Sequence, residues 1–513
     1  MLNNPSDDLS AVQRIELGIR RRRVLWLVAV VVLLVLIGVY LLVRLSPANH
    51  ADNYLNDLDH FKYGSIGSEQ DNGLPVAVWE ALPQLYPEVF KGRDYSVFGF
   101  LYETDPDGRR KDLPIGISRR TVYGIELGWL NCAVCHTGTV RERPGDPPRV
   151  IAGMPSNNLD LYRFVQFILS MADDPRMEAD SLIPAMEKSG THLDWLDRLI
   201  WRVVIIPRIQ TTLEERRARL APLLAAQSPW GPGRVDTFNP YKLIQFNMHA
   251  DSLSVAERVG TSDFPAIFNQ APREGMHLHW DGNNTSLAER NLSAALGAGV
   301  SEQTAVHPNI ERVASWLMTL PSPPSPYKPD PAKLTEGWTL YMQNCAACHG
   351  HQEPGGYVFE GGRLGQVDSI ARIGTDPARL NSYTEELSEK QKSLFYEDPR
   401  YRFRHFTKTD GYANMPLDGL WLRAPYLHNG SIPTLAALLL PPDQRPKVFV
   451  RGIDVLDGAN GGFLAPTCTP GQPLDVGFCF DTTQIGNSNS GHAYGTSLTA
   501  DQKDKLLAYL LTF

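Results

Sequence analysis

The chain has 513 residues, 42% of them apolar, which is enough for two domains that each bury a core and too long for one compact domain. Its formal charge of -8 comes from acidic residues spread along the sequence, and no basic run lies beyond the N-terminal region. Nucleic-acid binding, which needs a concentrated basic surface, is therefore excluded from the expected functions.

The N-terminal segment predicts a membrane anchor. Arg20 to Arg23 stand directly before the uncharged run VLWLVAVVVLLVLIGVYLLV, Val24 to Val43, which is long enough to cross a bilayer as one helix. A cleaved signal peptide, the alternative, usually has a shorter apolar core. The arginines favour a cytoplasmic N-terminus. We therefore expect a basic cytoplasmic tail at 1–23, a single-pass anchor of a bacterial inner membrane at 24–45, and the remaining residues in the periplasm.

The stretch NCAVCHTG contains the spacing C-x-x-C-H at Cys132, Cys135 and His136. Two thiols one helical turn apart can bond the vinyl groups of one porphyrin while the following histidine ligates its iron. A zinc ribbon would need more thiols, and a thioredoxin-type pair would not need the histidine. We therefore predict a covalently bound haem c in a first cytochrome c-like domain at 46–320.

This first domain is longer than a cytochrome c module requires. Residues Asp194 to Gln227 predict a helical insertion that is broken at Pro207. One face of the insertion carries Trp195, Leu199, Trp201 and Ile205. Such a face can lie against the membrane surface, and packing against the haem domain is the simpler alternative.

The proline-rich stretch PSPPSPYKPDP, residues 321–331, predicts an extended linker, because so many prolines exclude a helix. A helix is expected to start after Pro331 and to end at the second motif. This motif, NCAACHGH, provides Cys345, Cys348 and His349. It predicts a second covalent haem c in a second cytochrome c-like domain at 332–513.

Two later stretches, NIERVASWLMTLPSPPSP and the terminal ADQKDKLLAYLLTF, share a polar first turn, an aromatic–leucine pair and a stop. This pattern resembles the two-helix frame of the cytochrome c fold, in which the last helix crosses the first beside the haem. The predicted fold class is mainly α, with two tandem cytochrome c-like domains, long loops and one N-terminal transmembrane helix. The expected cofactors are two haem c groups with iron, and nothing in the sequence supports a bound calcium ion.

Cys468 and Cys479 lie outside both motifs, in the glycine- and proline-rich stretch GGFLAPTCTPGQPLDVGFCF. In an oxidising compartment such a pair is expected to form a disulfide that closes a surface loop. Two reduced structural thiols are the alternative.

The residue opposite His349 decides what the second haem does, and by chemistry Met415, His428 and His492 are all suitable. The stretch Met415 to Pro446, which contains APYLHNGS, resembles the C-terminal signature of dihaem bacterial cytochrome c peroxidases and their relatives. The later GNSNSGHAYGTSLT is similar to the rubber oxygenase branch of that superfamily. The resemblance implies that His492 is the sixth ligand, that His428 lies near the haem without binding iron, and that Met415 is not a ligand.

The first haem has several candidate residues on its far side. The stretch Ser262 to Gly299 resembles the W-D-G-x-x-x-S-L-E-x-Q segment of the peroxidases, in which acidic and amide side chains reach over the open iron. This resemblance implies a catalytic role for Glu289, whereas Arg290 stands where the peroxidases tend to carry the amide. A guanidinium can still polarise bound peroxide, because it is always charged and donates hydrogen bonds.

The rubber oxygenases instead keep this face apolar, and their resemblance implies that Phe264 or Phe268 walls the cavity, unless both are simply core residues. His277 and His279 alternate along a possible strand, so they would point to one side, where one of them could close the iron. Trp280 is a candidate bridge for electrons between the two haems, with a structural role as the alternative.

Together these patterns predict a membrane-anchored periplasmic dihaem c-type cytochrome. We expect it to act as a peroxidase- or oxygenase-like haem oxidoreductase, with an open N-terminal haem and an electron-relay C-terminal haem. The alternative is a pure electron-transfer cytochrome without its own substrate. Expected partners are the membrane, peroxide or dioxygen, and an electron donor or acceptor protein or a quinone-linked complex. The rubber oxygenase resemblance does not define the substrate, because cavity shape does.

Overall fold

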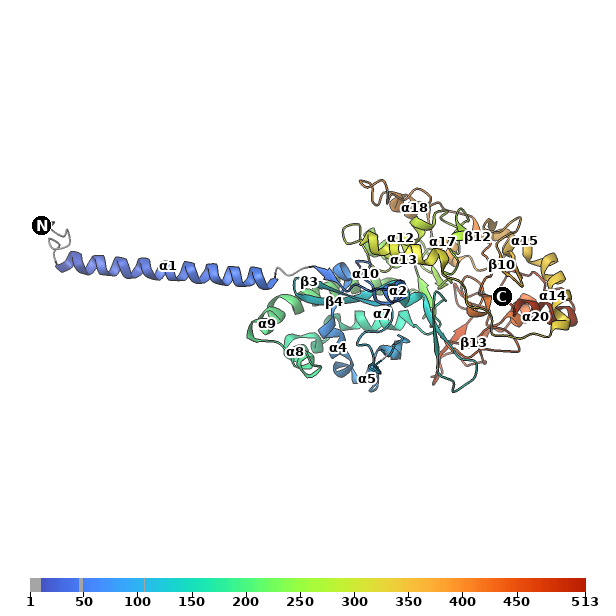
Figure 1. The fold of residues 1–513 in the computed structure, drawn as a ribbon, viewed down its shortest axis with the longest axis horizontal. Coiled ribbons are helices and arrows are strands. Elements are labelled where there is room, and N and C mark those ends of the chain that lie inside the picture. The colour runs from blue at the N-terminus through green and yellow to red at the C-terminus, as the bar shows by residue number, and fades with distance from the viewer. Residues whose placement is uncertain (1–10, 46–48, 106) are drawn as a thin grey trace.

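The computed structural model describes residues 11–45, 49–105 and 107–513. Residues 1–10 of the predicted tail and residues 46–48 at the predicted start of the first domain lie outside this description. Helices are the main regular structure, as predicted, and long loops and short antiparallel strand pairs join them (Figure 1).

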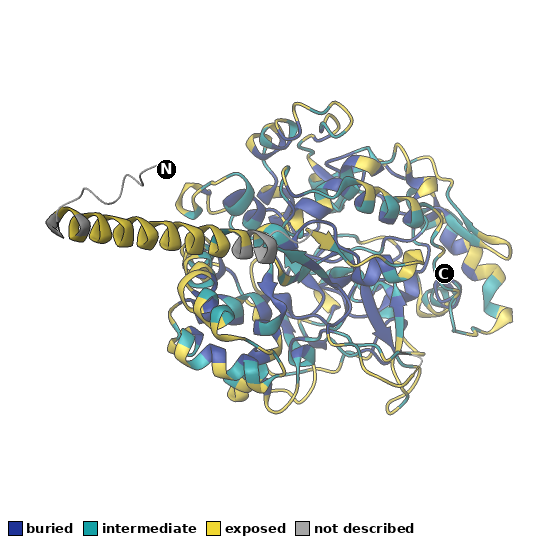
Figure 2. Ribbon diagram, turned by 60° about the vertical axis from the view of Figure 1, so that its left-hand side comes forward, coloured by how far each residue is buried: buried dark blue, intermediate teal, exposed yellow. Residues whose placement is uncertain are grey.

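The long helix α1, Ala11–Leu45, projects from one end of the body (Figure 1). Its segment Ile15–Val39 has a mean hydropathy of 2.5 and is long and apolar enough to cross a membrane. None of that segment is buried against the body, so the helix is yellow along most of its length in Figure 2. By length and composition the finding agrees with the predicted anchor. Arg20 to Arg23 belong to the same helix and do not form a separate tail.

The α-helices of the body are α2 (Asp57–Tyr63), α3 (Glu69–Asn72), α4 (Val76–Leu85), α5 (Pro87–Phe90), α6 (Cys132–Cys135), α7 (Leu161–Ser170), α8 (Ala179–Lys188), α9 (Trp195–Ile200), α10 (Ile206–Ala225), α11 (Asn239–Gln245), α12 (Leu287–Gly297), α13 (His307–Thr319), α14 (Pro331–Asn344), α15 (Ala346–His349), α16 (Ile370–Ile373), α17 (Ala378–Ser382), α18 (Glu385–Lys392), α19 (Leu435–Leu438) and α20 (Ala500–Leu510). The strands are β1 (His50–Ala51), β2 (Leu74–Pro75), β3 (Ile117–Val122), β4 (Ile125–Leu130), β5 (Thr137–Val140), β6 (Arg149–Ala152), β7 (Arg234–Asp236), β8 (Thr261–Asp263), β9 (His351–Glu353), β10 (Gly356–Val358), β11 (Val367–Ser369), β12 (Gly411–Ala413), β13 (Val448–Arg451) and β14 (Phe478–Asp481).

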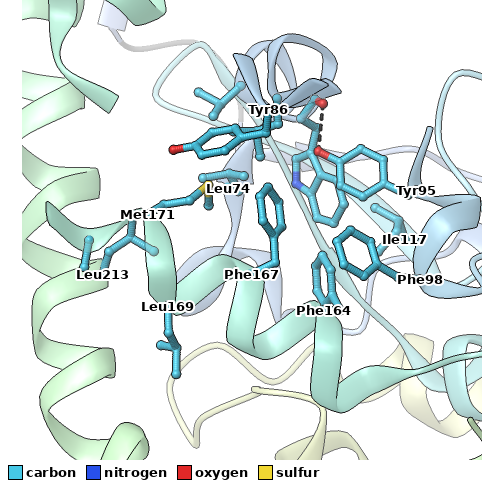
Figure 3. Packing of buried hydrophobic residues seen from close by; sticks show 14 of the residues in the cluster. Leu74, Tyr86, Tyr95, Phe98, Ile117, Phe164, Phe167, Leu169, Met171 and Leu213 are labelled. Carbon is cyan, nitrogen blue, oxygen red and sulfur yellow. Dashed lines mark hydrogen bonds between the residues drawn. The ribbon is translucent and has the colours of Figure 1, made fainter. Parts of the chain in front are cut away.

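A four-stranded antiparallel sheet, in the order β1-β3-β4-β2, leads the chain to the first motif, because β4 ends just before α6. An aromatic cluster forms much of the core of this half of the chain (Figure 3). Phe164 of α7 lies 5.7 Å, between ring centroids, from Trp79 of α4. The hydroxyl of Tyr95 donates a hydrogen bond of 2.8 Å to the carbonyl of Trp79. Helix α4, the turn at Tyr95 and α7 are thus joined through large aromatic rings.

The predicted helix break at Pro207 is wrong. Helix α9 continues through a π-helical turn, η4 (Trp201–Ile205), directly into α10, whose first turn contains Pro207. The π-helical turn accommodates the proline within this continuous helix: the N–H of Ile206 bonds to the carbonyl of Trp201, five residues back, directly before Pro207. Trp201 and Ile205 are buried in the first core, as the packing alternative expects, whereas Trp195 and Leu199 are 75% and 50% exposed. The predicted single face is therefore divided into a packed part and a solvent-facing part.

A pair of contacting helices accompanies each repeated motif. Helix α14 runs into the second motif and packs closely on the terminal helix α20. Gly337 permits this close crossing, because a Cβ there would lie 2.2 Å from the carbonyl oxygen of Lys505. Beside the first motif, α2 contacts both α6 and α13, and the rings of Phe61 and Trp316 lie 5.0 Å apart. Helix pairs of the kind expected from the sequence thus border both motifs.

The two halves of the chain do not have fully separate cores, although the length of the chain led us to expect them. One apolar cluster combines first-half and second-half residues, among them Met154, Phe268, Leu340, Trp421 and Leu506. Residues 321–330 have no regular secondary structure, as the proline-rich sequence predicts, but they are held in place. The indole of Trp421 donates to the carbonyl of Pro323 at 3.0 Å, and the hydroxyl of Tyr327 donates to Gly462 at 3.1 Å.

The predicted disulfide between Cys468 and Cys479 is present. It closes the loop between β13 and β14, where Cys479 pairs with Val450. Arg451, at the end of β13, donates to the carboxylate of Asp263 in the first half at 3.0 Å. The bridge therefore stabilises a hairpin that contributes to the contact between the two halves.

We expect the replacement Phe164→Ala to lower the free energy of unfolding by about 3–5 kcal/mol, because it leaves a cavity among large rings. Phe164 is 1% exposed and contacts the rings of Trp79, Tyr95, Phe98 and Phe100. Chemical denaturation followed by circular dichroism measures the change. Val255→Ala, at a side chain that is 81% exposed, is the control and should leave the denaturation midpoint unchanged. Equal midpoints for both variants would contradict this account of the core.

Candidate haem sites

The first motif is fixed by a buried asparagine. Asn131, at the N-cap of α6, accepts a hydrogen bond from the backbone N–H of Ala133 at 3.0 Å. Its side-chain amide donates to the carbonyls of Lys62 and Gly64, at 3.3 and 3.1 Å, where α2 ends. The turn that carries both cysteines is therefore held against α2. Sequence reasoning missed this role, although an asparagine directly before a helical turn is a recognisable capping signal.

The four motif cysteines are free thiols. Burial raises the pKa of Cys132 to about 11 and that of Cys135 to about 12. Burial also raises the pKa of Cys345 to about 12 and shifts that of Cys348 upward. Reactive redox cysteines have lowered pKa values, so these thiols are unlike a thioredoxin-type pair. Neutral thiols held one turn apart beside a histidine fit the covalent attachment of haem c.

The two proximal histidines are oriented in the same way. Nδ1 of His136 lies 2.9 Å from the carbonyl oxygen of Pro265, and Nδ1 of His349 lies 2.8 Å from that of Met415. A carbonyl only accepts, so each Nδ1 carries the proton and each Nε2 keeps its lone pair for a metal. Burial lowers the pKa of both rings, with Arg290 as a second cause at His136, where the pKa falls to about 3. Both imidazoles are thus neutral donors, the form that iron binds.

His492 faces His349. The two ring centroids lie 6.2 Å apart. A metal bonded to both imidazoles at about 2 Å would hold the ring centroids about 6 Å apart, so the spacing fits one iron between them. Burial, and then the neighbouring His349, lowers the pKa of His492 to about 3, which keeps it neutral. The donor set at the second motif therefore fits a haem with two histidine ligands.

The loop that carries His492 is held by a buried arginine that the sequence did not single out. Arg445 is 2% exposed, and its guanidinium donates to the carbonyls of Asn489, Gly491 and His492 at 2.6, 2.8 and 3.1 Å. The backbone N–H of His492 also donates to Ile373 at 2.8 Å. His492 has a φ of 44°, a left-handed conformation that costs about 1–3 kcal/mol in a non-glycine residue and persists where its surroundings impose it.

The other two candidates for the sixth position have different contacts. Met415 contributes its carbonyl to the proximal His349, as described above. His428 is stacked on Tyr412, with ring centroids 4.0 Å apart, and burial lowers its pKa to about 3. The neighbouring Asn429 donates to the carbonyls of Gly486 and Ser488, at 3.2 and 3.0 Å, and so ties this turn to the loop of His492.

The carboxylate of Glu289, the predicted catalytic acid, accepts four hydrogen bonds from other groups of the protein. One carboxylate oxygen accepts from the backbone N–H of Arg404 at 2.8 Å and from Nδ1 of His405 at 2.6 Å. The other oxygen accepts from the backbone N–H of His405 at 3.0 Å and from the amide of Asn284 at 3.1 Å. In this arrangement the carboxylate holds residues 404 and 405 against α12. The local sequence carries no signal for these hydrogen bonds, because they join segments that are distant in the sequence.

Arg290 is close to the first motif. Its positive charge lowers the pKa values of His136 and His279, and the thiol of Cys132 is near enough to raise the pKa of Arg290 in turn. Burial, followed by the charge of Arg273, lowers the pKa of Arg290 to about 10, so it stays charged at neutral pH. Across the described residues, its guanidinium forms neither an ion pair nor a hydrogen bond. The cation is therefore available to a ligand at this site.

The predicted strand around His277 and His279 is not present. The segment is a turn closed by a bridge between Leu278 and Asn284, and His279 has a φ of 63°. Nδ1 of His277 lies 2.8 Å from the carbonyl of Gly282, and Nδ1 of His279 lies 2.6 Å from Oδ1 of Asn283. The two rings thus have separate partners, because the positive φ breaks the alternation that a strand would have given.

Phe264, Phe268 and Trp280 lie at the contact between the two halves. Phe264 belongs to the first-half core, whereas Phe268 belongs to the cluster shared with the second half, and both are buried. The indole of Trp280 donates to the carbonyl of Asp263 at 2.8 Å, and its own carbonyl accepts from Ala413 at 2.9 Å. Asp263 and Ala413 each stand two residues before the carbonyl that accepts from a proximal histidine.

Within the described part of the chain, no group of three or more His, Cys, Asp or Glu side chains gathers to hold a further metal ion.

Residues 411–450 match a family model described as RoxA-like, cytochrome c-like. This stretch contains Met415 and the turn around His428, and it supports a cytochrome c of the RoxA-like branch, with the covalent haem c that such a domain implies. It agrees with the resemblance drawn from the sequence, at the level of the cytochrome and its branch.

Two curated proteins of Sinorhizobium fredii (strain NBRC 101917 / NGR234) are also similar to this chain. "Uncharacterized protein y4iM" is 30% identical over 249 residues, which cover 45% of this chain and 56% of that protein. "Uncharacterized protein y4iJ" is 31% identical over 238 residues, which cover 36% of this chain and 39% of that protein. The chain thus spans about half the length, or less, of these relatives.

We expect Arg445→Ala to loosen the loop of His492, because several carbonyls lose their donors at once in a buried place. The absorption and electron paramagnetic resonance spectra of the second haem should then show a reduced share of the low-spin form. Arg445→Lys is the matched variant; it keeps the charge but cannot reach all these carbonyls, so an intermediate loss is expected. Unchanged spectra for Arg445→Ala would show that the loop is held by other contacts.

Proposed function

We propose that the protein is a membrane-anchored, periplasm-facing dihaem c-type cytochrome that acts as a haem oxidoreductase. One observation carries the proposal: His349 has a facing imidazole at 6.2 Å between ring centroids, and His136 has none at such a distance among the described residues. This asymmetry supports two tandem cytochrome c-like modules with different tasks. The first haem is open to a small oxidant, and the second relays an electron.

Haem iron with two strong protein ligands passes electrons, and haem iron with a vacant position also binds peroxide or dioxygen. The residues around the two motifs differ in a way that supports these two roles. Pro265 and Met415 fix the proximal rings, whereas His492 occupies the far side of the second site alone. In the first site the charged group that acts on the neutral His136 is the unpaired Arg290.

Arg290 is the residue that we assign to contact a bound oxidant. Its guanidinium can donate several hydrogen bonds and keeps its charge at neutral pH, so it can hold and polarise a peroxide. We assign to Glu289 a positioning role, because four donors already saturate its carboxylate. Neutral His279, held by Asn283, is the nearest candidate for moving a proton at this site.

Trp280 is the proposed electron bridge. It is hydrogen-bonded through its indole to the segment that orients His136 and through its carbonyl to the segment that orients His349. Few residues separate the two proximal rings along this path. The electron source is a donor protein or a quinone-linked complex that meets the protein at the membrane, to which the apolar part of α1 anchors it.

The open first site can be tested with the ferric and half-reduced protein. We expect a high-spin charge-transfer band that shifts on adding cyanide or peroxide, with a second, low-spin signal that does not respond. His492→Ala should convert the second, low-spin signal into a high-spin signal that also responds to the added ligands. Arg290→Gln should weaken peroxide binding and leave both the low-spin and the high-spin signal in place. If neither ligand changes the spectrum in either redox state, the protein is a pure electron-transfer cytochrome.

The bridge can be tested by replacing Trp280. Trp280→Leu removes both the ring and the hydrogen bond to Asp263, so electron exchange between the haems should slow several-fold, while Trp280→Phe should have a smaller effect. Flash reduction followed by time-resolved absorption measures the exchange. Trp338→Phe, at an indole that is 44% exposed, is the control. An unchanged rate in Trp280→Leu would assign this tryptophan to packing alone.

A further inference from the structure

One helical face of the body exposes four large apolar side chains within ten residues. Trp195, Leu199, Val203 and Val204 are 75%, 50%, 60% and 60% exposed. They lie on α9 and on the π-helical turn that follows it, while Trp201 and Ile205 of the same turn are buried. We refer to these four residues as the α9 face. Soluble proteins rarely expose such a cluster without a partner for it.

A second exposed aromatic lies close to the end of α1. His50 of β1 pairs with Thr121 of β3, so the tip of the β3–β4 hairpin, Tyr123, extends two residues further toward α1. Tyr123 is 72% exposed, although most aromatic side chains of this half are buried. The five Cα–Cα steps from Leu45 to His50 can span at most about 18 Å of extended chain. The hairpin tip is therefore always near the end of the apolar helix.

The α9 face and the hairpin belong to the same end of the body. Helix α4 packs on β4 and on α8, and α8 in turn contacts η4, so the layers are continuous from the hairpin to the α9 face. Figure 1 shows α9 at the end of the body from which α1 projects, whereas α14, α15 and α20 lie at the opposite end.

We propose that this end of the body rests on the lipid bilayer, with the α9 face and Tyr123 inserted at the level of the headgroups. The proposal depends on the anchoring by α1 proposed above. An indole, a phenol and three aliphatic side chains are the chemistry that favours the boundary between headgroups and acyl chains. The contact leaves the second motif, beside α14, α15 and α20, at the end of the body away from the membrane.

A bilayer is a better occupant than a second copy of the chain. The anchor brings the bilayer within reach of this end of every molecule, whereas a second copy must arrive by diffusion. Both arginines beside the face are paired: Arg198 with Glu187 at 2.7 Å, and Arg202 with Asp180 at 2.6 Å. With its cations paired, such a rim lies on zwitterionic lipid without needing anionic headgroups.

The test uses the full-length haem-loaded protein in nanodiscs of phosphatidylcholine. Single cysteines, introduced as Leu199→Cys, Val203→Cys or Tyr123→Cys, are spin-labelled without reductant so that the Cys468–Cys479 bridge stays intact. Collisions of the label with oxygen, which is enriched in lipid, are compared with collisions with a water-soluble nickel chelate. Tyr396→Cys, at a side chain that is 70% exposed after α18, is the matched aqueous control, and Leu34→Cys reports on the anchor itself.

We expect the labels at 199, 203 and 123 to lose collisions with nickel and gain collisions with oxygen relative to Tyr396→Cys. Adding Val204→Asp to Leu199→Cys should return that label to water while the label at 34 stays in lipid. An anchor in lipid with aqueous labels on the α9 face would overturn this proposal and leave the anchoring intact. An aqueous label at 34 would instead refute the anchoring. Spin–spin broadening between singly labelled molecules would assign the face to a second copy and also overturn the proposal.

Discussion

Two hydrogen bonds, one at each repeated motif, determine what the rest of the structure can do. In each, a proximal histidine donates its Nδ1 proton to a backbone carbonyl, of Pro265 or of Met415. The bond fixes the tautomer and the ring plane, so Nε2 points away from the carbonyl with its lone pair free. The covalent motif alone places a histidine beside two thiols, and the carbonyl sets the orientation of that histidine and leaves its Nε2 able to bind a metal. Both carbonyls come from segments far away in the sequence, 129 residues from His136 and 66 residues from His349.

These carbonyls also explain why the two halves share their cores. The loop of Pro265 continues from Asp263, whose carboxylate is bound by Arg451 of the second half and whose carbonyl accepts from Trp280. The same Trp280 receives a hydrogen bond from Ala413, two residues before Met415. Moving one half against the other would therefore disturb both proximal histidines at once. The shared core therefore keeps the two motifs at a constant separation.

The features that the sequence predicted are those that local chemistry determines. The spacing of cysteines and histidine, the helix after Pro331, the helix at the C-terminus and the pairing of Cys468 with Cys479 each follow from a few neighbouring residues. Arg445 could not be predicted, because its partners are carbonyls of a loop more than forty residues away. The hydrogen-bond partners of Glu289 could likewise not be predicted, because the backbone N–H groups of residues 404 and 405 belong to the second half of the chain. The error at Pro207 arises because a π-helical turn directly before the proline lets the helix continue, whereas a proline inside a regular α-helix would break it.

The contrast between Arg290 and the other interior arginines bears most directly on function. Arg273, Arg379 and Arg451 each have a carboxylate partner, in Asp418, Asp281 and Asp263. Taking a cation out of water is costly, and pairing is the usual way in which a fold offsets that cost. Arg290 has no such partner in the described part of the chain, although it lies near enough to His136 to lower its pKa. A residue selected only for stability at this position would be apolar or paired. Arg290 therefore keeps a positive charge and its hydrogen-bond donors beside the first motif, and on this observation its proposed contact with a ligand rests.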